Sequence, residues 1–182
     1  LIYLCSMNYI YFYFILLLIG ISSCQYSKDA KAFSTSNISI KYPSYLFETN
    51  DVFPDKRTIL QLKNDYRDVY FIVVDHGQKP GAQGFDMMCD SILKMLKKNM
   101  KEPNIEAKDS SFTINNLNVR EFQISGVLSS EKQDHRFHFV IDVFETPNGH
   151  IYQTAGWLLR HKRERWLKDL QNAAYTFTVK TP

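Results

Sequence analysis

The chain has 182 residues, and its 22 basic and 19 acidic side chains leave a formal net charge of only +3. So small an excess of positive charge does not indicate nucleic acid or another polyanion as a partner. The first 23 residues carry no charge at all. The remainder is long enough for one domain of about 140 to 150 residues with its own hydrophobic core.

The uncharged N-terminal segment, residues 1–23, is predicted to be a signal peptide. Its apolar run between Met7 and Gly20 has the length of a signal-peptide hydrophobic region and is shorter than the ~20 residues that span a membrane. This interpretation places the start of translation at Met7. Counted from Leu1, the uncharged stretch is long enough for an uncleaved anchor helix, so that alternative stays open.

Residues Ile21-Ser22-Ser23-Cys24 resemble a bacterial lipobox, in which an aliphatic residue and two small residues precede an obligatory cysteine. The resemblance implies that diacylglycerol is joined to the Cys24 thiol, that the chain is cut just before Cys24, and that the new amino group carries an acyl chain such as palmitate. Such an anchor is essentially permanent, because each buried methylene contributes ~0.8 kcal/mol. No Lys or Arg precedes the apolar run, which departs from the family pattern.

The residues after Cys24 predict where the protein is held. Residues 24–36 are mostly small and polar, which is typical of a flexible tether. No Asp follows Cys24 directly, so by resemblance to enteric sorting rules nothing retains the protein in the inner membrane. Together with the aromatic-, Lys- and Asn-rich composition, this predicts a lipid-anchored envelope protein at the outer membrane of a Bacteroidetes-type cell, on its periplasmic or surface face.

Alternating apolar residues in the rest of the chain predict an antiparallel sheet. The expected strands cover residues 38–43, 58–63, 68–75, 112–114, 119–125, 136–145 and 150–158. The sequence Thr146-Pro147-Asn148-Gly149 supplies an Asn-Gly turn between the last two strands, and such a turn indicates a hairpin. Segment 68–75 is apolar on both sides, so both of its faces must be covered.

Two amphipathic helices are expected to cover the sheet. The first extends from Phe85 to Lys101 and is stopped by Pro103, and the second extends from about His161 to Ala174. Their polar sides suggest a basic surface for an anionic lipid or an acidic partner. The ordinary alternative is that these residues are only the solvated sides of the helices. The residues concerned are Lys94, Lys97, Lys98, Lys101, Arg160, Lys162, Arg165 and Lys168.

The region from Ile38 to Phe177 resembles the PsbP-like superfamily, which also contains the Mog-type nuclear import factor and many small bacterial lipoproteins. The residues that carry the resemblance are ISIKYP, INNLNVREFQISG and FHFVIDVFETPNGHIYQTAG. The resemblance implies an α+β fold, in which a central antiparallel sheet of about six to seven strands is covered by helices as an α/β/α sandwich. It predicts one such domain over residues 37–182. These are core and turn positions, and fold alone does not fix function.

Signatures of catalysis and of cofactor binding are missing from the sequence. Gly77, Gly81 and Gly84 do not have the spacing of a phosphate-binding loop. The five histidines lack metal-ligand spacing, and no nucleophile motif accompanies the pair Asp75-His76. Cys89, the only cysteine after Cys24, has no disulfide partner and lies on the apolar side of the first helix, which predicts a buried thiol. We therefore expect no metal and no cofactor.

These observations favour a membrane-anchored, non-enzymatic envelope lipoprotein that binds a protein partner or takes part in an assembly. One alternative is a small-ligand-binding or lipid-binding protein, and another is a hydrolase with a pocket near Gly77–Gly84. An apolar tunnel between sheet and helix would favour lipid binding, and a deep pocket with two convergent titratable side chains would favour a small ligand or an enzyme. A flat or shallow apolar surface near the hairpin would favour a protein partner.

Overall fold

The computed structural model describes residues 29–78, 82–129 and 134–180, with the side chains of residues 82, 83 and 107–109 left aside. The predicted signal peptide and Cys24 therefore lie outside the described residues. The chain divides into two units, Leu1–Ala30 and Lys31–Pro182. The second unit holds the predicted domain.

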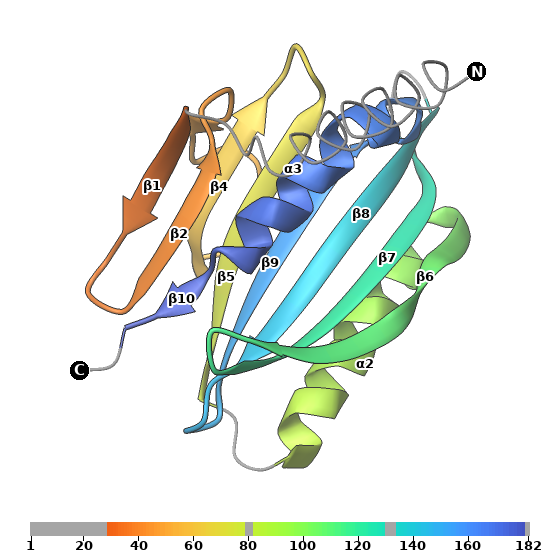
Figure 1. Cartoon of the computed structure of the whole chain (residues 1–182). Helices are drawn as coiled ribbons and strands as arrows, with labels where there is room; N and C mark the ends of the chain where they lie inside the picture. The colour runs from red at the N-terminus through yellow and green to blue at the C-terminus, as the bar shows by residue number, and fades with distance from the viewer. Residues whose placement is uncertain (1–28, 79–81, 130–133, 181–182) are drawn as a thin grey trace, which may run out of the picture. The chain divides into compact units, whose positions relative to one another are not determined.

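A seven-stranded sheet with the strand order β3-β4-β5-β9-β8-β7-β6 forms the centre of the domain (Figure 1). Every neighbouring pair is antiparallel, as the hairpin signal predicts. The strands are β3 (Phe47–Glu48), β4 (Thr58–Asn64), β5 (Val69–Gln78), β6 (Lys101–Ile114), β7 (Leu117–Ser129), β8 (Asp134–Glu145) and β9 (His150–Leu159).

A second, three-stranded sheet joins residues from both ends of the domain. It has the order β1-β2-β10, with β1 at Ala30–Ser34, β2 at Ile38–Pro43 and β10 at Thr178–Val179. Strands β10 and β2 are antiparallel. The expected tether over residues 24–36 thus differs from the structure, because residues 30–34 form a strand. Their side chains are mostly exposed, so they lack the apolar alternation that identifies a strand in a sequence.

Helices α2 (Ala82–Asn99) and α3 (Arg163–Tyr175) cover opposite faces of the seven-stranded sheet (Figure 1). Successive residues of a strand point to opposite faces of the sheet, so the buried apolar side chains form two separate cores, one on each face. On one face Phe122 packs with Cys89 of α2, and on the other Val119 packs with Leu170 of α3. We call them the α2 face and the α3 face. The predicted α+β sandwich is confirmed, and none of the described helices is both long and apolar enough to cross a membrane.

The hairpins around β6 and β9 show what the turn residues contribute. Gly149 has a φ of 78°, and its N–H donates to Thr146 O at 2.9 Å, which confirms the predicted turn. Asn115 and Asn116 also have positive φ, at 50° and 62°, and connect β6 to β7 as a two-residue hairpin loop.

Two expected boundaries are corrected by the structure. The first helix ends at Asn99 instead of Lys101, and the chain enters β6 at once. Pro103 lies inside β6, where a missing N–H is tolerated because β6 is an edge strand whose register shifts there. The second helix is preceded by the short 3₁₀ helix η1 (Arg160–Lys162).

Candidate functional site

A groove of about 480 Å³ lies between α2 and the sheet, and we call it the α2 groove. Its floor includes Ile72 of β5, Ala155 of β9 and Ile141 of β8, which lie side by side in register. One wall is α2, through Met88, Ile92, Met95 and Leu96, and the other includes Phe53 from the loop between β3 and β4. A mostly apolar cavity of this volume is typical of a small-molecule site.

Strand periodicity explains the composition of the floor. Gln153, Ala155 and Trp157 alternate along β9, so all three side chains point to the α2 face. Ala155 stands between Ile72 and Ile141, and its small side chain leaves room above the middle of the floor. Four residues along a strand cover about 13 Å, which is therefore the length of the floor from Gln153 to Trp157.

An aromatic row closes one end of the α2 groove. The ring of Trp157 stacks on Tyr70 with centroids 5.5 Å apart, and on Phe139 with centroids 5.8 Å apart. Trp157 and Phe139 both line the groove. Flat apolar rings at this end can contact the end of an alkyl chain or the face of another ring.

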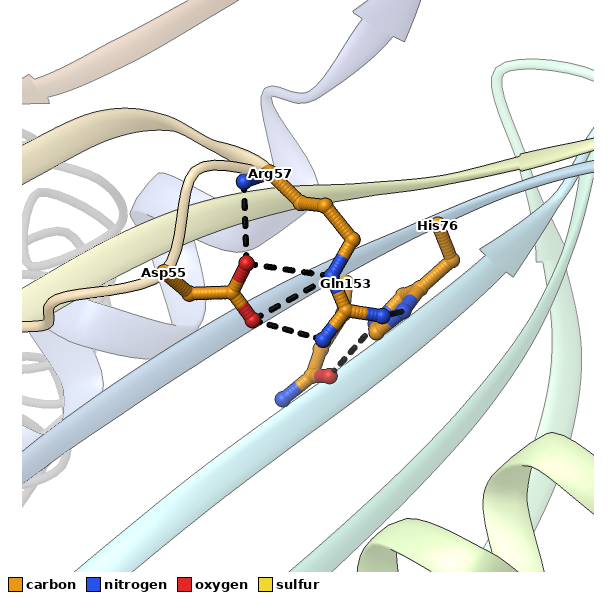
Figure 2. Close-up of polar contacts among 4 residues, drawn as sticks. All are labelled: Asp55, Arg57, His76 and Gln153. Carbon is orange, nitrogen blue, oxygen red and sulfur yellow. Dashed lines mark hydrogen bonds and ion pairs between the residues drawn. The ribbon is translucent and has the colours of Figure 1, made fainter.

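A chain of four polar residues forms the opposite end (Figure 2). Arg57 Nε and Nη2 donate to the carboxylate of Asp55, at 3.1 Å to Oδ1 and 2.6 Å to Oδ2. Arg57 Nη1 lies 3.5 Å from His76 Nδ1, and His76 Nε2 lies 2.9 Å from Gln153 Oε1. An arginine can only donate, so His76 Nδ1 accepts and Nε2 carries the proton that is donated to Gln153.

The loop that carries Phe53 and Asp55 is held by one glutamine of β4. Gln61 Oε1 accepts from the backbone N–H groups of Val52 and Phe53, at 2.9 and 2.8 Å. Gln61 Nε2 donates to Phe53 O at 3.0 Å. Asp55 in turn accepts from the backbone N–H of Arg57 at 2.9 Å. These bonds fix both the apolar wall and the polar end of the groove.

The protonation states at the polar end follow from these contacts. Hydrogen bonds from the Arg57 side chain lower the pKa of Asp55 to about 2, so Asp55 is a carboxylate at neutral pH. Burial lowers the pKa of His76 below its usual value, and the bond to Gln153 opposes that shift. His76 is therefore neutral at pH 7. The arrangement places a charged pair and a neutral imidazole beside an apolar cavity.

The eight predicted basic residues divide into two groups on opposite faces of the sheet. Lys94, Lys97 and Lys98 are exposed on α2, and Lys101 begins β6. The other four belong to η1 and α3: Arg160, Lys162, Arg165 and Lys168.

Several of these cations already have partners within the chain. Lys101 Nζ lies 3.4 Å from Asp134 Oδ2, and Arg160 Nε lies 3.5 Å from Glu106 Oε1. Lys162 is paired with Asp68. The two helices therefore do not combine their positive charge into one patch.

Near the Gly77–Gly84 segment, the residue that lines the α2 groove is His76, which directly precedes Gly77, and none of the described lining residues is a glycine. His76 lines the α2 groove, whereas Asp75 lies on the other side of β5, where its Oδ1 is 2.6 Å from His150 Nε2. Gly77 has a φ of 75° at an irregularity of β5, and residues 79–81 lie outside the described residues. Cys89 is buried, as predicted. Among the described residues, no three His, Cys, Asp or Glu side chains are grouped so that they could hold a metal ion.

A buried polar network on the α3 face was not predicted. Glu121 Oε1 accepts from Gln123 and from Gln171, each at 3.0 Å, and Glu121 also accepts from the hydroxyl of Tyr175 at 2.5 Å. Gln123 Oε1 lies 3.2 Å from Nε2 of His138, which is completely buried. The sequence does contain a signal for this network. Glu121 and Gln123 lie two and four residues after the buried Val119 on the same strand, so all three side chains point to the same face of the sheet.

The network continues to two further carboxyl groups. Glu106 Oε2 accepts from Arg163 Nη1 at 2.5 Å and lies 3.7 Å from His138 Nδ1. Burial, followed by the charge of Arg163, lowers the pKa of His138 to about 4. Complete burial, and then the neighbouring Glu121, raises the pKa of Asp142 well above its usual value. The α3 face thus holds a network of buried ionisable groups.

The layers and strand order define an α+β domain whose fold is similar to those of several solved structures. The solution structure of cyanobacterial PsbP (CyanoP) from Synechocystis sp. PCC 6803 is similar, with a TM-score of 0.64 and 9% identity over 88% of this chain and 99% of that chain. LpqN of Mycobacterium tuberculosis, described as involved in cell envelope biogenesis, has a TM-score of 0.55 and 10% identity over 86% of this chain and 88% of that chain.

A crystal structure from Bacteroides thetaiotaomicron VPI-5482 is also similar, with a TM-score of 0.54 and 13% identity over 84% of this chain and 49% of that chain. Neither a family model nor a curated protein matches the sequence. At these identities the likeness to solved structures shows the fold alone. The site must therefore be interpreted from its own residues.

Proposed function

We propose that this protein is a non-enzymatic binding protein of the cell envelope, and that its α2 groove binds the apolar chain of an amphiphile. The observation that carries the proposal is the groove itself, an apolar cavity between sheet and helix with a polar end. Among the functions considered from the sequence, this geometry supports lipid binding over a hydrolase, since no nucleophile is hydrogen-bonded to His76 among the described residues.

The dimensions and walls of the groove suit an alkyl chain. A floor of about 13 Å accommodates a chain of medium length, and burying ten methylenes supplies roughly 8 kcal/mol before the costs of association. Met88 and Met95 of the wall have flexible, polarisable side chains that adapt to different ligand shapes. Met95 is 48% exposed, so part of the wall lies at the surface where a ligand can enter.

Photo-crosslinking tests this proposal. The full chain, kept in polymer-bounded membrane discs, is exposed to a monoacylglycerol that carries a diazirine on its alkyl chain, and adducts are mapped by mass spectrometry. We expect adducts on α2 and on the floor strands β5 and β9, and their loss in Ala155→Phe, which fills the floor. Ser110→Phe, the same bulk at an exposed position of β6, is the matched control and should keep them. Adducts that persist in Ala155→Phe would contradict the proposal.

The proposed envelope location rests on Cys24 as the lipid-anchored first residue of the mature protein. Its support is the sequence Ile21-Ser22-Ser23-Cys24 and the likeness of the fold to LpqN, which is described as involved in cell envelope biogenesis. Metabolic labelling with a palmitate analogue provides the test. Cys24→Ala should lose the label, and Cys89→Ala, which changes the only cysteine after Cys24, should keep it. Unchanged label and mass in Cys24→Ala would show that the lipobox assignment is wrong.

A protein partner is a second candidate function, favoured by a stack of side chains next to α3. The guanidinium of Arg67 lies 4.3 Å from the ring centroid of Tyr45 and 4.5 Å from that of Trp166, and Arg165 lies 4.7 Å from Trp166. The neighbouring Tyr66 is fully exposed. Arg, Trp and Tyr are the residue types that most often dominate binding energy at protein interfaces.

Affinity capture after cross-linking in membranes tests this second candidate. The wild type should recover a protein partner that Trp166→Ala fails to recover, whereas Lys168→Ala on the same helix should still recover it. The comparison with Cys24→Ala shows whether capture depends on the anchor. Recovery of no partner by the wild type would contradict an assembly role.

A further inference from the structure

The charges that line the α2 groove cancel. They belong to Asp55 and Arg57, whose Oδ2 and Nη2 atoms are 2.6 Å apart, and the remaining polar lining residues are His76, Ser91 and Gln153. Burial lowers the pKa of His76, so its ring adds no charge at neutral pH. The nearby Asp75 stands on the other face of β5, opposite Tyr152 and beside His150. The polar end therefore has no net charge.

The guanidinium of Arg57 is already committed to partners within the chain. Its Nε and Nη2 donate to Asp55, and its Nη1 donates to His76. A ligand carboxylate or phosphate at this end would share the guanidinium with Asp55 and would lie beside a second negative charge. The Arg57 side chain is 57% exposed, so an anion there loses only part of its water, and without an unpaired cation that partial loss is unfavourable. A ligand cation would meet the same difficulty beside Arg57.

Hydrogen-bonding capacity nevertheless remains at this end. Gln153 Oε1 accepts from His76, whereas Gln153 Nε2 donates to no group among the described residues and points away from the other contacts in Figure 2. The carboxylate of Asp55 has further lone pairs and a side chain that is 21% exposed. Gln153 also adjoins Ala155 on the apolar floor. A donor and an acceptor thus stand where the apolar cavity meets solvent.

We infer that the α2 groove selects an amphiphile whose head is uncharged and both donates and accepts hydrogen bonds, as the hydroxyl groups of a monoacylglycerol do. This inference rests on the proposed function of the groove. It adds the chemical class of the head group, which the apolar walls alone do not specify. Fatty carboxylates and alkylammonium ions of the same chain length are the excluded classes.

Competition against the diazirine monoacylglycerol tests the inference on the full chain in membrane discs. The competitors are decanoyl glycerol, decanoate and decyltrimethylammonium, and the adducts are counted on peptides of α2, β5 and β9. Asp55→Asn leaves the positive charge of Arg57 without a counter-charge, and Arg57→Gln leaves the negative charge of Asp55 without one. Lys56→Gln removes an exposed cation next to Arg57 that does not line the groove, and it is the matched control. The concentration of each competitor in the membrane is measured directly, so that partitioning does not enter the comparison between competitors or, for each competitor, the ratio between variant and wild type.

For the wild type, decanoyl glycerol should compete at about tenfold lower concentration than decanoate or decyltrimethylammonium. Asp55→Asn should improve competition by decanoate about tenfold, and Arg57→Gln should improve competition by decyltrimethylammonium by a similar factor. Lys56→Gln should leave all three ratios unchanged. Because Asp55 and Arg57 belong to a loop at the surface, neither variant removes core packing, and unchanged unfolding midpoints verify that.

Two results would overturn the inference, and they are distinct from failure of the proposed function. Decanoate competing as well as decanoyl glycerol in the wild type would show that the groove accepts an anion. Charge variants that change none of the ratios would show that Asp55 and Arg57 do not face the head. In both cases adducts would still form in the groove. No groove adducts with the wild type would overturn the proposed function and the inference together.

Discussion

The two faces of the central sheet are built from alternate residues of the same strands, but α3 packs closely on one face, whereas α2 leaves a groove on the other. On the α3 face Leu170, Ala173 and Phe177 are completely buried, and polar residues such as Asp142 are buried with them. On the α2 face a groove of about 480 Å³ separates the helix from the floor. The difference teaches that the fit of the covering helix, rather than the strand pattern, decides which face of a sheet is available to a ligand.

Residue size explains part of this contrast. On the α3 face Gly156 of β9 lets α3 approach closely, since a Cβ at Gly156 would lie 3.0 Å from Leu170. On the α2 face the small residue of β9 is Ala155, which lines the groove. Small residues therefore allow tight packing on one face and a cavity on the other.

The largest expected effect is on stability and concerns the α3 face. Leu170→Ala should lower the free energy of unfolding by about 3 kcal/mol, because it removes a fully buried side chain and leaves a cavity. Met95→Ala on the groove wall should change it by about 0.5 kcal/mol or less. Urea unfolding followed by tryptophan fluorescence measures both. Equal losses from the two variants would contradict the contrast between the faces.

The network of the α3 face should make stability depend on pH. The pKa of His138 is lowered to about 4 in the folded protein, so the unfolded chain, with a pKa near 6.5, binds the proton more readily. Stability should therefore be complete above about pH 6.5 and fall as pH decreases toward 4, by on the order of 2 kcal/mol. Urea unfolding at a series of pH values measures this, and the free energy of unfolding should depend less steeply on pH for His138→Gln than for the wild type. His135→Gln, on the same strand but outside the network, should keep the wild-type slope.

Loss of a single hydrogen bond in the network should have a moderate effect. Tyr175 donates to Glu121, and Tyr175→Phe removes that donor while Glu121 stays 6% exposed. The expected cost is about 1 to 2 kcal/mol, because a nearly buried carboxylate loses a partner. Tyr66→Phe, at a fully exposed position, is the control and should change the unfolding midpoint little. A neutral result for Tyr175→Phe would show that water replaces the hydroxyl.

A smaller stability effect than that of Tyr175→Phe should come from the loop that forms the second wall of the groove. Gln61→Met removes three bonds to Val52 and Phe53 but leaves the core intact, so it should cost about 1 kcal/mol. Adducts of the monoacylglycerol probe should nevertheless decrease several-fold, because the loop no longer holds Phe53 and Asp55 in place. Lys168→Met, at an exposed position of α3 outside the groove, is the control. Undiminished adducts would show that the loop does not shape the site.

The sequence predicts the parts of the fold whose pattern repeats locally. Strands β5, β8 and β9 are strongly apolar, and the Asn148-Gly149 turn fixes the hairpin between the last two. The first half of β6 and all of β1 escape prediction because they are edge strands with mostly exposed side chains. Their partners, rather than their own residues, make them strands.

The candidate site is harder to predict because its residues are distant in the sequence. His76 and Gln153 are 77 positions apart, and Gln61 acts on the groove only by holding a loop that begins nine residues earlier at Val52. No short motif records such contacts. The basic residues show the opposite case. Their patterns in the two helices are similar in the sequence, but the helices cover opposite faces of the sheet, and the sequence does not reveal this.

The pairing of β10 with β2 has a consequence for the order in which the protein can fold. Thr178 of β10 lies opposite Ser39 of β2. Strand β2 is therefore synthesised early, but it can pair with β10 only after nearly the whole chain has been made. Helix α3, which packs against the buried Ile38 and Ile40, is also made late. Contacts so distant in sequence slow folding. Under the proposed envelope location, this delay would leave β2 unpaired with β10 until nearly the whole chain has crossed the membrane.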